Sequence, residues 1–294
     1  MSINNILLIC AALLPAIVLC IYVFKMDRAD KEPIGLLLGL LALGAVSCLP
    51  AGILEELAFG VINIIFSPFF FEEAGEIYMP DAIYTIYNGV TNFIGVALIE
   101  EGLKFLVLFL VTRKNKNFNS LFDGLIYAVF VSLGFAAFEN VLYVLRYGWG
   151  NALARALTSV PAHMFFSVLM GYYYSMWHVY EKAKNQERQF KMMGLIPPFA
   201  VEYSGGKYLT LSFFIPIVIH GLYDYYCNME TIWSTLVFIA FVVGLYIYCF
   251  RKIHQLSKCD VDDITYTNYM VFSKYPGLYE RIIEINSQNN WGSY

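Results

Sequence analysis

Long apolar stretches alternate with short polar segments along most of the chain. A helix needs about 20 apolar residues to cross a bilayer, and seven stretches come close to or exceed that length. They are residues 6–24, 34–54, 83–112, 121–147, 158–180, 208–227 and 231–250. The pattern therefore predicts an all-α, polytopic transmembrane helix bundle of about seven spans. The lengths of 83–112 and 121–147 predict tilt, kinks or projection beyond the lipid.

The polar segments between these stretches differ strongly in charge. Segments 25–33, 113–120, 181–207 and 251–294 contain 16 of the 19 lysines and arginines. Because basic residues concentrate on the cytoplasmic side of membrane proteins, these four segments are predicted to be cytoplasmic. The N-terminus then lies outside and the C-terminus inside.

This topology divides the chain into a transmembrane domain, 1–250, and a cytoplasmic tail, 251–294. Between the second and third spans, residues 55–82 run from an apolar aromatic stretch into an acidic one. We interpret them as an outer segment that is interfacial or re-entrant. Within it, Glu55 and Glu56 are interpreted as an interfacial acidic pair.

The composition supports the membrane assignment and excludes several other classes. Hydrophobic residues make up 59% of the chain and charged residues 14%, far from the balance of soluble domains. The net charge of −4 argues against nucleic acid as a partner. The six cysteines show no pairing pattern that predicts a disulfide framework.

Charged and histidine side chains inside the predicted spans each need a reason, because insertion at a helix centre costs about 2.5–3.5 kcal/mol. They form four groups, and helical spacing places Lys104 beside both preceding glutamates and His220 beside Asp224. Small residues near Gly134 allow another helix to approach closely. Estimated depths predict a water-filled cavity opening outward that joins the groups. The groups are Glu100, Glu101 and Lys104; Glu139 and Asn140; His163; and His220 and Asp224.

Several chemistries fit such a cavity. Two histidines with carboxylates form the donor set of a catalytic zinc or another divalent metal. The same residues can activate water without a metal, with one glutamate as general base. They also suit a proton- or cation-coupled transporter, and a non-catalytic scaffold is a further alternative. A serine mechanism through Ser167, one turn from His163, has no supporting sequence context.

The same residues resemble the motifs of the PrsW family of intramembrane proteases, which is related to the type II CAAX prenyl proteases. The family's EExxK matches Glu100 to Lys104, its FxxxE matches Phe135 to Glu139, and its HxxxD-type motif matches His220 to Asp224. The resemblance extends over about residues 95–230. It implies a membrane-embedded endopeptidase in the bacterial inner membrane that cuts membrane-associated proteins near the outer face. An anti-sigma factor at its first cut is the implied substrate.

The chemistry of these residues, together with the resemblance, predicts their roles. Glu100 or Glu101 is expected to activate water, with Lys104 supporting the pair. Either metal binding or oxyanion stabilisation is expected of Glu139, His163 and His220. Asp224 is expected to be catalytic or to orient His220, and Phe135 and Asn140 to support the site. The CAAX relatives end the middle motif in histidine, so Glu139 argues against a prenylated substrate and leaves that histidine's role to His163.

Overall fold

The computed structural model describes residues 2–28, 30–73, 76–229, 231–258 and 261–290, and these residues are predominantly helical. The expected all-α class is confirmed. The helices are α1 (Ile3–Met26), α2 (Ile34–Phe66), α3 (Asp81–Val90), α4 (Leu98–Thr112), α5 (Asp123–Tyr147), α6 (Trp149–Leu157), α7 (Ser159–Met192), α8 (Gly206–Cys227), α9 (Ile232–Lys258), α10 (Asp263–Lys274) and α11 (Leu278–Asn290). A π-helical segment, η2 (Thr91–Ala97), joins α3 to α4.

Five helical segments of the described chain are long and apolar enough to cross a membrane. They contain α1, α2, α5, α7 and α9 and correspond to five of the seven predicted spans. The other two predicted spans coincide with α3–η2–α4 and with α8. Helices α3 and α4, with 10 and 15 residues, are each too short to cross a membrane alone, and α8 carries His220 and Asp224, which lower its apolarity. A total of seven crossings therefore stays a prediction.

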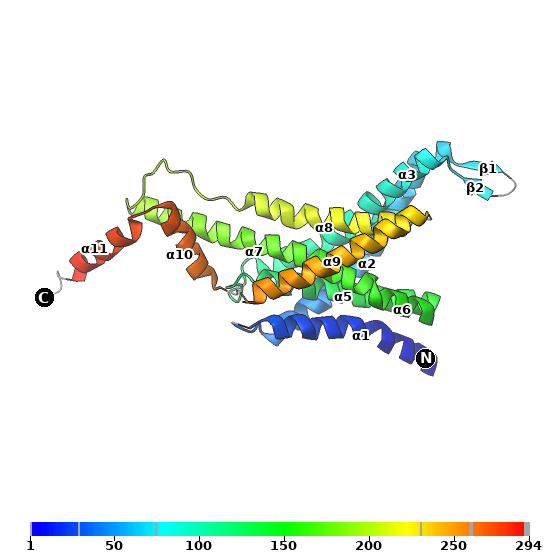
Figure 1. Cartoon of the computed structure of the whole chain (residues 1–294), viewed down its shortest axis with the longest axis horizontal. Helices are drawn as coiled ribbons and strands as arrows, with labels where there is room; N and C mark the ends of the chain where they lie inside the picture. The colour runs from blue at the N-terminus through cyan, green and yellow to red at the C-terminus, as the bar shows by residue number, and fades with distance from the viewer. Residues whose placement is uncertain (1, 29, 74–75, 230, 259–260, 291–294) are drawn as a thin grey trace.

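Helices α5 and α7 form the centre of the bundle, and α1, α2 and α9 lie around them (Figure 1). In the most apolar window of α5, 72% of the residues are buried, against 17% in α9. The exposed face of α9 is itself apolar, with Leu236, Ile239 and Val243 accessible. A helix that exposes apolar side chains in this way is suited to contact lipid.

The central helices approach each other closely at glycines. A Cβ atom on Gly134 of α5 would lie 2.0 Å from the carbonyl oxygen of Leu41 in α2. Likewise, a Cβ atom on Gly171 of α7 would lie 2.5 Å from the carbonyl oxygen of Gly124 in α5. Only hydrogen fits at such crossings. The close approach predicted beside Gly134 is therefore confirmed, and its partner is α2.

One end of the molecule holds the N-terminus of α1, helix α6 and a small hairpin (Figure 1). Helix α2 continues without a break to Phe66, so residues 55–66 are helical. A short 3₁₀ turn, Ser67–Phe69, then leads into the antiparallel strands β1 (Phe71–Glu73) and β2 (Glu76–Tyr78), with Phe71 opposite Tyr78.

The opposite end holds α10, α11 and the α7–α8 connection (Figure 1). Helix α9 runs past residue 251 to Lys258, and α10 then packs against the end of α7. There the buried Glu187 accepts hydrogen bonds from Lys274, at 2.6 Å, and from the backbone of Tyr203, at 2.6 Å. The bundle and the C-terminal helices are thus tied together. Residues 259–260 and 291–294 of the expected tail, and residues 74–75 of the expected outer segment, lie outside the described residues.

Candidate active site

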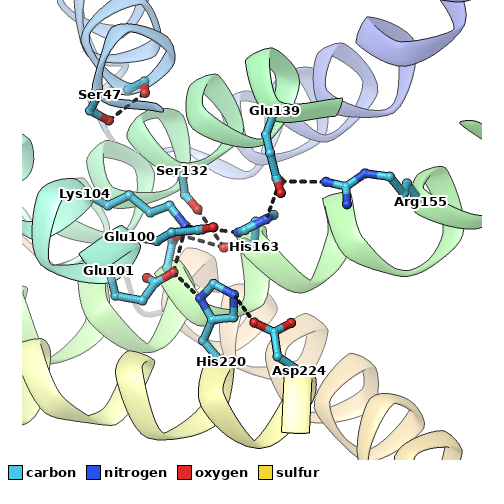
Figure 2. A network of polar contacts seen from close by, with 12 residues as sticks. Ser47, Glu100, Glu101, Lys104, Ser132, Glu139, Arg155, His163, His220 and Asp224 are labelled. Carbon is cyan, nitrogen blue, oxygen red and sulfur yellow. Dashed lines mark hydrogen bonds and ion pairs between the residues drawn. The ribbon is translucent and has the colours of Figure 1, made fainter. Parts of the chain in front are cut away.

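Four helices bring polar side chains together inside the bundle (Figure 2). Glu100 and Glu101 occupy the first turn of α4, which places Lys104 one turn further on the same face. The other three helices each contribute from a different side. The residues that meet are Glu100, Glu101 and Lys104 of α4, Glu139 of α5, His163 of α7, and His220 and Asp224 of α8.

Lys104 lies at the centre of this group. Its Nζ is 2.9 Å from Glu100 Oε2, 2.8 Å from Glu101 Oε1 and 3.0 Å from His163 Nδ1. The ammonium also sits 4.2 Å from the centre of the Phe135 ring. A lysine that is 1% exposed needs such partners to remain in the interior. The expected supporting contacts of Lys104 and Phe135 are therefore present.

His163 links Lys104 to Glu139. Its Nδ1 faces the Lys104 ammonium, and its Nε2 lies 3.1 Å from Glu139 Oε2. An ammonium can only donate, so Nδ1 must accept and Nε2 must carry the proton that is donated to Glu139. Ser132 and Ser167 both donate to the backbone carbonyl of His163, at 2.9 and 2.8 Å. The Ser167 hydroxyl is thus committed to helix packing, which disfavours a serine mechanism.

His220 is held between two carboxylates. Its Nδ1 is 3.0 Å from Glu101 Oε1, and its Nε2 is 3.2 Å from Asp224 Oδ2. The ring stacks on Phe166, with centres 4.7 Å apart. Since a neutral imidazole has one donor nitrogen, carboxylates on both nitrogens require either both ring protons or an added cation.

Glu139 is bound from the other side by Arg155 of α6. Arg155 Nη2 donates to Glu139 Oε2 at 2.6 Å, and its Nε donates to Asn140 Oδ1 at 3.0 Å. The Asn140 amide in turn donates to the backbone carbonyl of Ala12 in α1, at 2.8 Å. Asn140 therefore anchors α1 and orients the arginine that pairs with Glu139.

Four of these residues form a group that suits a cation. One donor atom from each of Glu100, Glu101, His163 and His220 lies within 4.8 Å of the others. The buried Glu101 Oε2 has no hydrogen-bond partner among the described residues. An unpaired buried carboxylate oxygen beside a Glu/His donor set fits a divalent ion. Glu139 lies outside this group, although the sequence placed it among the expected ligands.

A cavity of about 530 Å³ opens beside the cluster. Glu100, Glu139, His163, His220 and Asp224 line it, whereas the fully buried Glu101 and Lys104 do not. Arg155, Asn151 and Asn228 line its far part, near the ends of α6 and α8. The cavity therefore exposes one face of the cluster to solvent-sized molecules and keeps the other face in the protein.

The π-helical segment η2 sets where α4 and α8 lie. It immediately precedes the turn that carries Glu100, and π-helical turns recur at functional sites because they shift the side chains that follow. A Cβ atom on Gly221 would lie 2.5 Å from the Phe93 ring of η2. The glycine after His220 thus allows α8 to approach η2, which brings His220 to Glu101.

Sequence reasoning missed two cavity residues. Arg155 falls between the predicted spans 121–147 and 158–180, which places it in an outer loop of the predicted topology, yet it pairs with Glu139. The available signal was a basic residue on the side of the membrane that has few of them. Glu55 was interpreted as half of an interfacial pair, but it lines the cavity while Glu56 is exposed. Its spacing of four from Ala51 and Phe59 on one helix face was the signal there.

Fold and site together define a polytopic helical protein with a buried Glu/His/Lys centre beside a polar cavity. The sequence profile of the PrsW family intramembrane metalloproteases matches residues 32–249. The chain belongs to this family, as its motifs predicted.

Individual relatives agree with this assignment. The Protease PrsW of Clostridioides difficile strain 630 is 30% identical over 80% of this chain and 85% of its own length. That of Geobacillus kaustophilus strain HTA426 is 30% identical over 84% of this chain and 91% of its own. That of Bacillus subtilis strain 168 is 28% identical over 83% and 93%. No solved structure gives a significant match.

Proposed function

We propose that this chain is an intramembrane endopeptidase that hydrolyses peptide bonds of membrane-associated proteins at the cavity-facing side of the cluster. One observation carries the proposal: the Glu100 carboxylate opens into a cavity that it shares with His163 and His220. Hydrolysis needs a base beside water and groups that stabilise negative charge on the substrate carbonyl. The cavity provides both within one enclosed space.

Glu100 is the general base in this proposal. Its partner glutamate, Glu101, is fully buried and already bonded to Lys104 and His220, whereas Glu100 faces the cavity. Glu100 takes a proton from water, whose oxygen attacks the peptide carbonyl carbon. When the carbon–nitrogen bond breaks, the proton passes to the leaving amine.

The remaining residues orient the reaction. Glu101 and Asp224 fix the His220 ring from both nitrogens, so the imidazole faces the cavity without rotating. Lys104, which does not line the cavity, fixes the positions of Glu100, Glu101 and His163 through its contacts with them. Arg155 offers a cation at the cavity wall, and two of its five N–H groups bond Glu139 and Asn140. Charge that develops on the substrate oxygen can thus be met by the guanidinium.

A divalent metal is proposed as the cofactor, held by Glu101, His163 and His220 of the four-residue group, with zinc as the first candidate because its preferred ligands are present. Glu100, the fourth member of the group, would remain free to act as the base. Bound there, it would act as a Lewis acid and help to deprotonate water. To serve as ligands, His163 would have to release its contact with Lys104, and His220 would have to release one of its two carboxylates.

The positions of the two ends of the molecule indicate on which side of the membrane cleavage takes place. The cavity reaches the ends of α6 and α8, and α6 lies at the same end as the N-terminus (Figure 1). The four basic segments predict that the opposite end is cytoplasmic. We therefore propose cleavage near the outer face of a bacterial inner membrane, with the first cut of an anti-sigma factor as the proposed process.

Transport through the same cluster receives less support. All residues of α5 from Asp123 to Ala136 are buried, so a packed core separates the cavity from the opposite end of this helix. A relay across the membrane would need polar groups to continue through that core.

A survey of new protein N-termini in membranes tests the proposal. Cells expressing wild type, His220→Ala or His254→Ala at equal levels are compared; His254 is exposed and remote from the site motifs. We expect new termini near the outer ends of membrane segments with wild type and His254→Ala, and none with His220→Ala. Identical surveys for all three proteins would contradict the proposal.

A further inference from the structure

Glu55 differs from the other carboxylates of the cavity. Among the described residues, four carboxylates line it, and three have a basic partner: Glu100 has Lys104, Glu139 has Arg155, and Asp224 has His220. No ion pair or hydrogen bond joins the Glu55 side chain to another described residue. Its carboxylate is thus available to a group that enters the cavity.

The wall around Glu55 leaves room for such a group. Cys48, Ala51, Gly52, Glu55 and Phe59 form one face of α2, and all line the cavity. A Cβ atom on Gly52 would meet nothing within 4 Å, so the space beside Glu55 is open. At Phe59, the last of these residues, the face is held in place because the Phe59 ring packs against Gly95 of η2.

The distance between Glu55 and the catalytic residues can be estimated along the axis of α2. Cys48 packs in the same cluster as Phe135, the ring that carries the Lys104 ammonium. Glu55 follows Cys48 by two helical turns, which is about 10 Å along the axis. An extended peptide covers that distance in about three residues. A substrate bound at Glu100 therefore places a side chain roughly three residues from the cut bond near Glu55.

The charges around Glu55 decide which kind of substrate side chain can bind beside it. Glu100 and Glu139 lie close enough to repel Glu55 electrostatically. Lys104 and His220 also act on Glu55, with the opposite sign, but each is already bonded to other carboxylates. Arg155, the nearby cation of the wall, is already bound to Glu139 and Asn140. A positive group from the substrate would relieve this repulsion, whereas an acidic one would add to it.

We infer that Glu55 forms a substrate subsite that binds a lysine or arginine side chain about three residues from the cleaved bond. This inference rests on the proposed protease function. In this arrangement α2 recognises the substrate sequence, and residues of α4, α7 and α8 carry out the hydrolysis.

The test uses the full-length protein in lipid vesicles with a pool of single-span reporter peptides whose outer juxtamembrane positions are randomised. Products are sequenced to find the cut bond and the residues around it. Wild type, Glu55→Gln, Glu55→Lys and Glu56→Lys are compared. Glu56 is the matched control because it is adjacent in sequence, exposed and outside the cavity.

Wild type and Glu56→Lys are expected to enrich lysine or arginine about fivefold at one position near the third residue from the cut, as for a partly exposed charge pair. Glu55→Gln should cleave the pool but lose this enrichment, and Glu55→Lys should select aspartate or glutamate there. An unchanged basic preference in both Glu55 variants, or no preference in wild type, would overturn the subsite alone. A pool left uncut by wild type would overturn the proposed function and the subsite with it.

Discussion

The two halves of helix α5 show how one helix serves two purposes. From Asp123 to Ala136 every residue is buried, and the half is packed against α2 and α7 through glycines. From Ala137 onward the helix is only partly buried, and Glu139, Leu142 and Tyr143 face the cavity. The boundary between the halves lies near Phe135, whose ring makes a cation–π contact with the Lys104 ammonium.

The difference explains how charged groups are kept inside this bundle. The packed half is a rigid wall that fixes the backbones of α5 and α7. The open half can then carry the Glu139 carboxylate, because Arg155 of α6 and His163 of α7 hold it from neighbouring helices. Mutations in the packed half should therefore affect folding, and mutations in the open half should affect cleavage.

The largest effect is expected from Gly171→Leu in α7, at its crossing with the packed half of α5. The new side chain would collide with the backbone of α5 at Gly124, and overpacking typically costs about 1–3 kcal/mol, with larger values where the backbone has to shift. We expect loss of folded protein, measured as the melting temperature and yield after detergent extraction. Gly39→Leu, on the exposed face of α2 where a Cβ meets nothing, is the control and should fold normally. Normal folding of Gly171→Leu would contradict the close crossing.

Removal of metal should come next in size and should act on the site beside the open half, without effect on the packed half. A chelator such as 1,10-phenanthroline is expected to lower cleavage by roughly a thousandfold, the scale of Lewis-acid catalysis. Added Zn²⁺ should restore the rate, while the melting curve persists because Lys104 still bonds both glutamates. If the chelator has no effect on cleavage, Lys104 and not a metal ion supplies the positive charge at the centre of the site.

Arg155→Gln should produce an intermediate loss. It removes the bonds to Glu139 and Asn140, and loss of such orienting contacts typically costs about 10- to 100-fold in activity. Initial cleavage rates of reporter peptides give the measurement. Arg146→Gln serves as the control, since Arg146 is exposed near the end of α5. Equal rates for the two variants would show that Glu139 does not need its arginine.

Asp224→Asn is expected to have the smallest effect, a decrease of less than about tenfold. The carboxylate is 23% exposed and contacts His220 at 3.2 Å, and an asparagine can still accept this hydrogen bond. Asp81→Asn, on the exposed first turn of α3, provides the comparison. A complete loss of cleavage would instead give Asp224 a direct part in the chemistry.

The bundle and most of its cluster were predictable from the sequence, because polar residues in apolar spans are costly and therefore conspicuous. Spacing alone paired Lys104 with both glutamates and His220 with Asp224, and both contacts are present. The close crossing at Gly134 was also predictable from its small neighbours, although its partner helix was not.

Other features depend on tertiary structure and left weak signals. The Glu139–Arg155 pair joins α5 to α6 across a turn, and no helical spacing connects the two residues. Glu55 was assigned to an interface because α2 was expected to end near residue 54, whereas it continues to Phe66. The π-helical turn at η2 depends on packing against α2 and α8, which local sequence does not reveal.

The most direct test of the central claim is a paired measurement on Glu100→Gln in lipid vesicles: the cleavage rate of a reporter peptide and the melting temperature of the protein. Glu56→Gln is the control. If Glu100 is the cavity-facing base, cleavage falls by roughly 100- to 10,000-fold, while the melting temperature stays near that of wild type. Cleavage at the wild-type rate by a folded Glu100→Gln protein would contradict the account.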